Sequence, residues 1–172
     1  MKQGEVLEVL SLAREIKANP HQYKDCLSGK KIGLYFQKPS MRTRVSFEVG
    51  INELGGFAIN LHSEEIQIGK REPIKDVARV LSRYLDAMML RVNRHSDLEE
   101  LVKYSSIPVV NGLSDLSHPC QALADALTII EYKGSSPKKI VYFGDGNNVC
   151  NSLIEIFHAL KMDRSEERRV GK

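Results

Sequence analysis

The chain has 172 residues, of which 42% are hydrophobic and 27% charged, a composition typical of a globular protein with a core rather than of a disordered chain. Its formal net charge is +3, of which the last nine residues carry +2, so a nearly neutral body argues against nucleic-acid binding. No run of about 18 apolar residues is present, and no membrane span is expected.

The three cysteines are far apart and lack metal-ligand spacing, so no metal site is expected from them. The N-terminal residues carry acidic side chains and helical periodicity, which is unlike a signal or transit peptide. An odd number of cysteines without an export signal predicts reduced thiols in a cytoplasmic protein.

Hydrophobic spacing predicts an alternation of helices and strands along the chain. Residues 5–18 are expected to form a helix that ends before Pro20, and the apolar run 30–36 a buried strand. Residues 43–56 are expected to form a helix closed by a Gly-Gly pair. The remaining expected elements are strand 57–62, polar loop 63–72, helix 73–85, strand 86–92, helix 95–105, strand 107–113, helix 117–134, strand 138–146 and helix 147–162.

Strands that alternate with helices and are apolar throughout predict an α/β fold with a parallel sheet flanked by helices. The segment KGSSPKK at 133–139 combines Gly, Ser and Pro and is the best candidate for a linker. Beyond it come one more strand and one helix. The charged residues 164–172 do not continue the pattern, so we expect a non-native or disordered tail there.

The segment QKPSMRTRVSFE places two arginines where the predicted strand 30–36 is followed by a helix. In open parallel sheets ligands gather beyond the carboxyl ends of strands, and a helix start offers N–H groups and a positive dipole to an anion. Ser40 and Thr43 add hydroxyl donors, and Arg42 adds a planar fork that matches phosphate. Arg44 points to a different helix face and is expected to be structural. Surface arginines beside a capping serine are an equally good interpretation of these residues alone.

Two further groups of polar residues follow predicted strands. After strand 107–113, the segment HPCQALAD places His118 and Gln121 on one face of a helix start. Strand 86–92 carries Arg91 near its end. Polar groups at several strand ends are together stronger evidence for a shared anion site than any single motif. The segment GDGNNV lacks the third glycine of a dinucleotide-binding loop, so no nicotinamide cofactor is expected.

With these motifs in this order, the chain resembles the aspartate/ornithine carbamoyltransferase family. The similarity extends from about residue 29 to residue 163. It rests on four segments, which are PSMRTRVSFEVG, QIGKREPIKDVARVLSRYLDAMMLR, HPCQALAD and GDGNNVCNSL. The family pattern usually reads S-T-R-T-R, and Met41 stands where its first threonine would be, which leaves only the backbone N–H at that position.

The resemblance implies a role for each matching residue. Arg91 and His118 are the implied catalytic residues, and Asn148 is the implied contact to ornithine. Gln67 is implied to reach the site of a neighbouring subunit in a homotrimer. The residues implied to bind carbamoyl phosphate are Ser40, Met41, Arg42, Thr43, Gln67, Arg91, His118 and Gln121. The resemblance implies no cofactor and no metal.

The resemblance also implies a division of the chain into domains. Residues 1–132 would be the carbamoyl phosphate-binding domain, 138–163 the start of an incomplete ornithine-binding domain, and 164–172 the tail. Family residues that bind ornithine later in the second domain have no counterpart in this sequence. We therefore expect the chain to bind carbamoyl phosphate but to convert ornithine negligibly. One strand and one helix of a second domain are also expected to expose the apolar residues Ile154, Ile156, Phe157 and Leu160.

Several functions stay open at this stage. Gln67 and the Asn147-Asn148 pair favour the ornithine-using branch over the aspartate-using one, but another amine, such as putrescine or an acylated ornithine, is an alternative. A non-catalytic protein that binds carbamoyl phosphate or phosphate is a second alternative. Binding to nucleic acid or to a membrane is not expected, because the body is nearly neutral and has no stripe of basic and aromatic residues.

Overall fold

The chain forms two compact units, which we describe separately. The computed structural model describes residues 1–69, 71–134, 139–162 and 164–168, with the backbone alone for Glu65 and for 164–168. The central unit is Asn19–Asp115, and the terminal unit combines Met1–Ala18 with Leu116–Lys172. Within the described residues, no helix is both long and apolar enough to cross a membrane.

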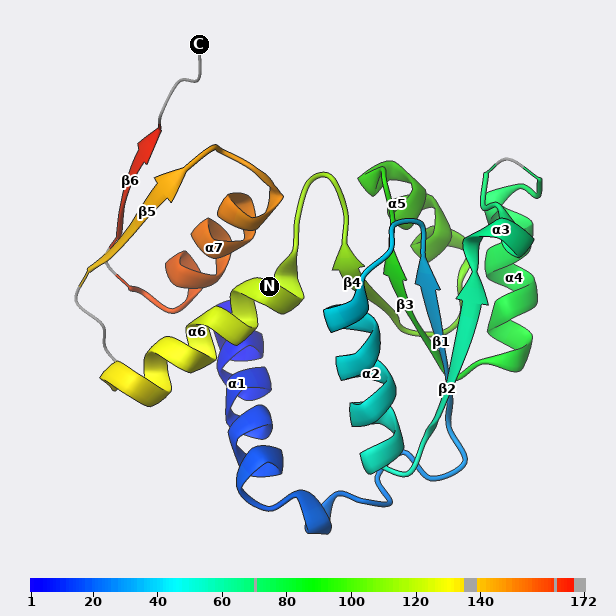
Figure 1. The fold of residues 1–172 in the computed structure, drawn as a ribbon, viewed down its shortest axis with the longest axis horizontal. Coiled ribbons are helices and arrows are strands. Elements are labelled where there is room, and N and C mark those ends of the chain that lie inside the picture. Colours follow the sequence, from blue (N-terminus) through cyan, green and yellow to red (C-terminus); the bar gives the residue numbers. More distant parts are fainter. Residues whose placement is uncertain (70, 135–138, 163, 169–172) are drawn as a thin grey trace. The chain divides into compact units, whose positions relative to one another are not determined.

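The central unit contains a four-stranded parallel sheet with the strand order β2-β1-β3-β4 (Figure 1). Its strands are β1 (Lys31–Phe36), β2 (Phe57–His62), β3 (Ala87–Arg91) and β4 (Val109–Leu113). Its helices are η1 (Pro20–Gln22), α2 (Met41–Glu53), α3 (Ser63–Ile66), α4 (Ile74–Tyr84) and α5 (His95–Tyr104). The direction of strand addition reverses between β1 and β3, which is where open α/β sheets bind their ligands.

Helices cover both faces of this sheet. Tyr35 and Met88 belong to a core formed with α4 and α5, whereas Leu34 and Met89 pack with Ile51 of α2. Neighbouring residues of one strand therefore pack into cores on opposite faces of the sheet, because successive side chains of a strand alternate between the two faces. This double burial explains the apolar sequence of β1 and β3, and it confirms the predicted α/β fold with a parallel sheet flanked by helices.

The terminal unit is built around three helices and two strands. They are α1 (Gln3–Ala18), α6 (Pro119–Lys133), β5 (Ile140–Gly144), α7 (Asn148–Ala159) and β6 (Arg164–Arg168). Val6 and Leu10 of α1 bury their side chains against residues of α6 and α7. An ion pair between Lys17 and Glu131, with a 2.7 Å N–O distance, joins α1 to the end of α6. Helix α1 is thus held by α6 and α7, which follow the whole central unit in the sequence.

The structure differs from the sequence-based expectations in three places. A short helix, α3, lies within the expected loop 63–72. Residues 164–168 form a strand parallel to β5 where a tail is expected, while 169–172 lie outside the described residues. Ile156 and Phe157 are each 4% exposed, so the expectation that they face solvent is wrong, because α1 and α6 cover them.

Candidate functional site

The start of α2 is the first candidate anion site. Ser40 is the N-cap residue in extended conformation, and its side chain makes no capping hydrogen bond. The first intrahelical bond runs from Arg44 N to Ser40 O at 3.1 Å, so the N–H groups of the first turn have no acceptor within the helix. Arg42 is exposed and Thr43 half-buried. This helix start therefore combines an uncapped positive end with a hydroxyl and a guanidinium group.

Arg91 lies at the adjacent strand end. In the sheet register, Arg91 of β3 stands beside Phe36 of β1, and Gln37 N donates to Arg91 O at 2.9 Å. The Arg91 Nε atom is buried and has no hydrogen-bond partner among the described residues, and burial lowers the pKa of its guanidinium group. A buried donor without a partner is costly in a folded protein, and an anionic ligand would satisfy it.

A cavity of about 400 Å³, lined by both polar and apolar residues, opens beside the start of α2. Ser40 and Met41 line it, whereas Arg42 and Thr43 do not. Arg44 also lines it, which agrees with the expectation that Arg44 and Arg42 point to different faces of the helix. The full lining is Leu34, Phe36, Pro39, Ser40, Met41, Arg44, Asn60, Leu61, His62, Ser63 and Glu64. Sequence reasoning missed the contribution of β2, although its carboxyl end, next to that of β1 in a parallel sheet, was the available signal.

Gln67 lies in a separate cavity of about 320 Å³ in the central unit. It follows α3 with a left-handed backbone (φ 44°), and its Nε2 donates to Glu64 O at 3.1 Å. The cavity also contains Gln37, whose Oε1 accepts a hydrogen bond from Asn93 N at 2.7 Å. Gln67 does not line the cavity that holds Ser40, although Ser63 and Glu64 line both cavities. Its predicted contact with a neighbouring subunit stays a prediction.

The other predicted site residues belong to the terminal unit. His118 is the N-cap residue of α6, and its backbone N–H donates to Ser152 Oγ of α7 at 2.8 Å. Gln121, one turn into α6, donates from Nε2 to Asp125 Oδ1 at 2.9 Å. Asn148 is the first residue of α7, and its Oδ1 accepts from Val149 N at 2.9 Å. The sequence thus placed these residues correctly at helix starts.

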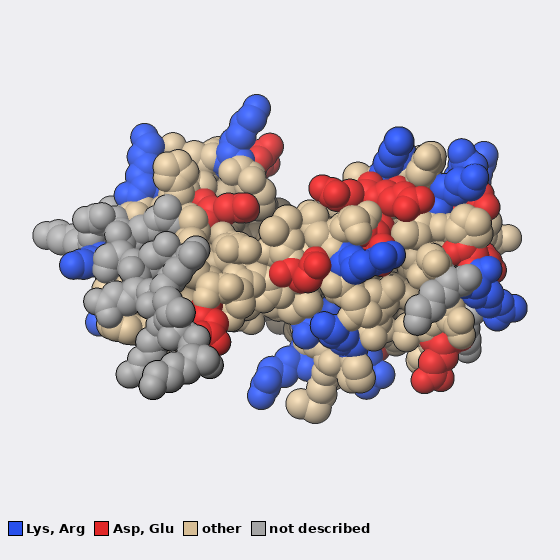
Figure 2. Space-filling view, turned by 90° about the horizontal axis from the view of Figure 1, so that it is seen from above, with Lys and Arg blue, Asp and Glu red and all other residues tan. Residues whose placement is uncertain are grey.

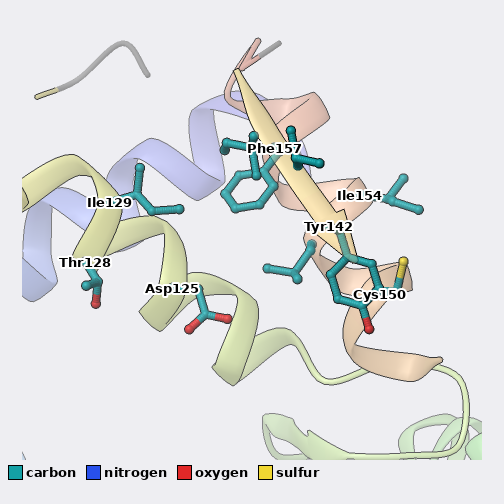
Figure 3. Close-up of a pocket in the computed structure, with 10 residues that line it drawn as sticks. Asp125, Thr128, Ile129, Tyr142, Cys150, Ile154 and Phe157 are labelled. Atoms are coloured by element: carbon teal, nitrogen blue, oxygen red, sulfur yellow. The ribbon is translucent and has the colours of Figure 1, made fainter. Parts of the chain in front are cut away.

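An apolar cavity of about 340 Å³ lies between α6, β5 and α7 in the terminal unit (Figure 3). None of the predicted site residues lines it. Asp125 is its only charged lining residue, and most of the others are apolar. A ligand site needs several convergent polar groups, so this cavity is better explained as an apolar surface that these three elements cover only in part.

The described residues hold no group of three or more His, Cys, Asp or Glu side chains that could bind a metal ion. Basic and acidic side chains are interspersed over the described part of the face seen in Figure 2.

The predicted site residues offer arginine, histidine, amide and hydroxyl groups, together with backbone N–H groups. Such groups bind an anion and stabilise developing negative charge.

Comparison with known proteins identifies the relatives of the chain. The family described as "Aspartate/ornithine carbamoyltransferase, carbamoyl-P binding domain" matches residues 1–131. The ornithine carbamoyltransferase of Listeria innocua is 54% identical over 151 residues, which are 87% of this chain and 48% of that protein. That of Methanocaldococcus jannaschii is 50% identical over 155 residues, which are 90% of this chain and 51% of that protein. The chain spans about half the length of these curated relatives.

Solved structures give the same result. The ornithine carbamoyltransferase of Thermus thermophilus has a TM-score of 0.92 and 40% identity, covering 99% of this chain and 60% of that one. The anabolic ornithine carbamoyltransferase of Campylobacter jejuni has a TM-score of 0.92 and 39% identity, covering 99% of this chain and 56% of that one. Sequence motifs, fold and relatives agree, and the chain belongs to the aspartate/ornithine carbamoyltransferase family.

Proposed function

We propose that the chain is the carbamoyl phosphate-binding part of an enzyme that transfers the carbamoyl group to the side-chain amine of ornithine, giving citrulline and phosphate. The main support for the proposal is the position of the S-M-R-T-R segment in the fold. It forms the uncapped start of α2 after β1, and the partly buried Arg91 ends β3 on the other side of the strand-order reversal. Two cationic groups and free N–H groups at this edge suit a doubly charged phosphate.

The proposed reaction needs no cofactor. The neutral amine attacks the carbonyl carbon of carbamoyl phosphate, a tetrahedral intermediate forms, and the C–O bond to phosphate breaks. Negative charge grows on the carbonyl oxygen and then on the leaving phosphate. Ser40, Met41, Arg42 and Thr43 would hold the phosphate, the methionine through its backbone N–H. Preorganised donors of this kind contribute about 2.7–4 kcal/mol each to such transition states in other enzymes.

Family membership supports the remaining roles that we propose. Arg91 would bridge the phosphate and the carbonyl oxygen, while His118 and Gln121 would contact the carbamoyl group. Asn148 would contact the amino-acid end of ornithine, and Gln67 would reach the site of a neighbouring subunit. We propose a cytoplasmic homotrimer, or a multiple of trimers, for the full-length protein. The domain limits at residues 132 and 138 are part of the same proposal.

Calorimetric titration with carbamoyl phosphate tests the binding proposal. Arg42→Ala removes a bidentate charged contact, so the affinity should fall about tenfold to a hundredfold. Arg14→Ala, on α1 in the terminal unit, is a matched control that removes an exposed arginine and should leave the affinity unchanged. Equal affinity of the Arg42→Ala variant and the unchanged chain would contradict the proposal.

A citrulline assay tests the transfer step. With ornithine and carbamoyl phosphate, this chain alone is expected to form citrulline negligibly, because it spans about half of its relatives. Fast turnover by this chain would overturn that expectation. For a full-length protein that contains this sequence, a panel of ornithine, aspartate, putrescine and an acylated ornithine would show which amine is accepted.

A further inference from the structure

Two adjacent residues of α7 hold the segment that leads into α6. Ser152 is 2% exposed, and its Oγ accepts the backbone N–H of His118 at 2.8 Å. Asn151 donates from Nδ2 to the backbone oxygen of Leu116 at 3.0 Å. The two bonds lie on either side of Ser117, so the short connection between β4 and α6 is fixed at two points. A serine hydroxyl buried in the interior of a helix is unfavourable unless it has such a partner.

The start of α7 is itself well anchored. Asn147 is its N-cap residue, and its Oδ1 accepts hydrogen bonds from Val149 N at 3.0 Å and Cys150 N at 3.1 Å. Asn148 and Ser152 are one helical turn apart, so they share a face of α7. One rigid helix therefore carries both the residue proposed to contact the amine and the residue that holds His118.

We propose that Ser152 and Asn151 are positioning residues that fix His118 where it meets the carbamoyl group, at a set distance from Asn148. The inference rests on the proposed function for the role of His118. The bonds themselves act on the backbone at the N-cap of α6, and this backbone determines the direction of the His118 side chain. Displacing a transition-state contact by about 1 Å is enough to impair catalysis a hundredfold, so two bonds that restrict this backbone matter for the reaction.

The hydrogen bond from His118 N to Ser152 lies directly before the start of α6. Pro119, at the first position of α6, has no N–H group, so the bond from His118 N is the last backbone donor contact before the helix. Ser152→Ala removes the acceptor and leaves this partly buried N–H without its partner. The backbone of His118 is then expected to rotate toward another acceptor, because an unsatisfied N–H is costly.

Two measurements on this chain test the inference. With histidine labelled with ¹³C and ¹⁵N, and His118 assigned through His118→Gln, NMR reports the environment of its ring and amide. Calorimetry with inorganic phosphate and with carbamoyl phosphate separates phosphate binding from carbamoyl contact. Ser152→Ala should shift the His118 signals and lower the ratio of carbamoyl phosphate affinity to phosphate affinity roughly three- to tenfold. Its phosphate affinity should stay unchanged.

Matched variants show whether the effects of Ser152→Ala on the His118 signals and on the affinity ratio come from a general loss of stability. Ser82→Ala removes a part-buried helical hydroxyl of α4, bonded to Ala78 O at 2.6 Å, and should leave the His118 signals and the affinity ratio unchanged. Ser152→Thr keeps a hydroxyl acceptor for His118 N, so its His118 signals and its affinity ratio should resemble those of the unchanged chain. Asn151→Asp removes the donor at an exposed position, so it should shift the His118 signals more weakly without disturbing the core.

The outcomes separate this inference from the proposed function. Unchanged His118 signals in both Ser152→Ala and Asn151→Asp would overturn the positioning role. If the unchanged chain binds neither phosphate nor carbamoyl phosphate, the proposed function fails, and the role of Ser152 in orienting His118 is still decided by NMR. Shifted His118 signals with an unchanged affinity ratio would overturn the link to carbamoyl recognition.

Discussion

Strands β1 and β3 of the central unit and β5 of the terminal unit are all largely apolar, but they are buried to different extents. In the central unit, three consecutive residues are buried in β1 and three in β3, because helices cover both faces. In the terminal unit, β5 alternates, and its outward residues Val141 and Phe143 are 43% and 74% exposed. The sequences of β1, β3 and β5 are all largely apolar, yet only β1 and β3, which lie between two helical layers, are buried over three consecutive residues. An apolar strand sequence thus predicts that the strand is buried on both faces. The helices that pack on the sheet determine how much of it is buried in the structure.

The largest expected loss of stability comes from shortening a side chain in the sheet core. Leu34 is 0% exposed, so Leu34→Ala should lower the free energy of unfolding of the central unit by about 3 kcal/mol. Val141→Ala in the half-covered β5 should cost less than about 1 kcal/mol. Urea unfolding followed by residue-resolved hydrogen exchange measures both units in one experiment. Equal losses would show that the two strands are equally covered in solution.

Helix capping should differ between the units in the same measurement. Asn147 caps α7 with two hydrogen bonds, whereas the side chain of Ser40 makes none at the start of α2. Asn147→Ala should therefore destabilise the terminal unit by about 1 kcal/mol, and Ser40→Ala should change the stability of the central unit little. Ser40→Ala should instead weaken carbamoyl phosphate binding. A larger stability loss from Ser40→Ala would mean that this serine is a structural cap.

Low pH should reduce the stability of the central unit because it protonates the Asp86 carboxylate. The backbone N–H of Lys31 donates to its carboxylate at 2.8 Å and lowers its pKa, and Lys30 and Lys31 act in the same direction. A depressed folded-state pKa stabilises the fold at neutral pH, and this contribution is lost as pH falls below about 4. Asp86→Asn should lower the urea midpoint at pH 7 and leave it nearly unchanged at pH 2. An equal difference at both pH values would contradict this role.

The smallest expected change in stability concerns Phe143. Its side chain is 74% exposed, so Phe143→Ser should leave the unfolding free energy within about 0.5 kcal/mol of the original. An exposed apolar patch favours association, so the variant should remain monomeric at higher concentration than the unchanged chain. Sedimentation velocity over a concentration series measures this. Lys139→Ser, at an exposed position next to β5, is the matched control.

The sequence predicted most of the fold, because the helices and strands of the central unit carry strong local signals. The start of α2 after β1 followed from the apolar run and from the Pro-Ser pair before the helix. The helix α3 was missed because SEEI is a short polar segment without apolar periodicity. The burial of Ile156 and Phe157 was also missed, since it depends on α1, whose position could not be inferred from local spacing.

Local sequence also accounts for only part of the candidate site. Arg91 and the first turn of α2 were expected at strand ends, and the sheet register places them at one edge. The lining of the cavity by residues of β2 was not expected, and which arginine of α2 lines it depends on how α2 is rotated against the sheet. Helix rotation is determined by tertiary packing, here by Ile51 and its neighbours in the core, and not by spacing within the helix alone.

The ion pair between Lys17 and Glu131 joins groups 114 positions apart in the chain, and the cluster around Val6 closes the same large loop. During synthesis, α1 leaves the ribosome long before its partners exist. The central unit can complete its sheet in the meantime, because all its strands lie between these two positions. The buried face of α1, with Val6 and Leu10, must stay uncovered until α6 and α7 emerge, so a chaperone would have to protect it from the moment α1 is synthesised.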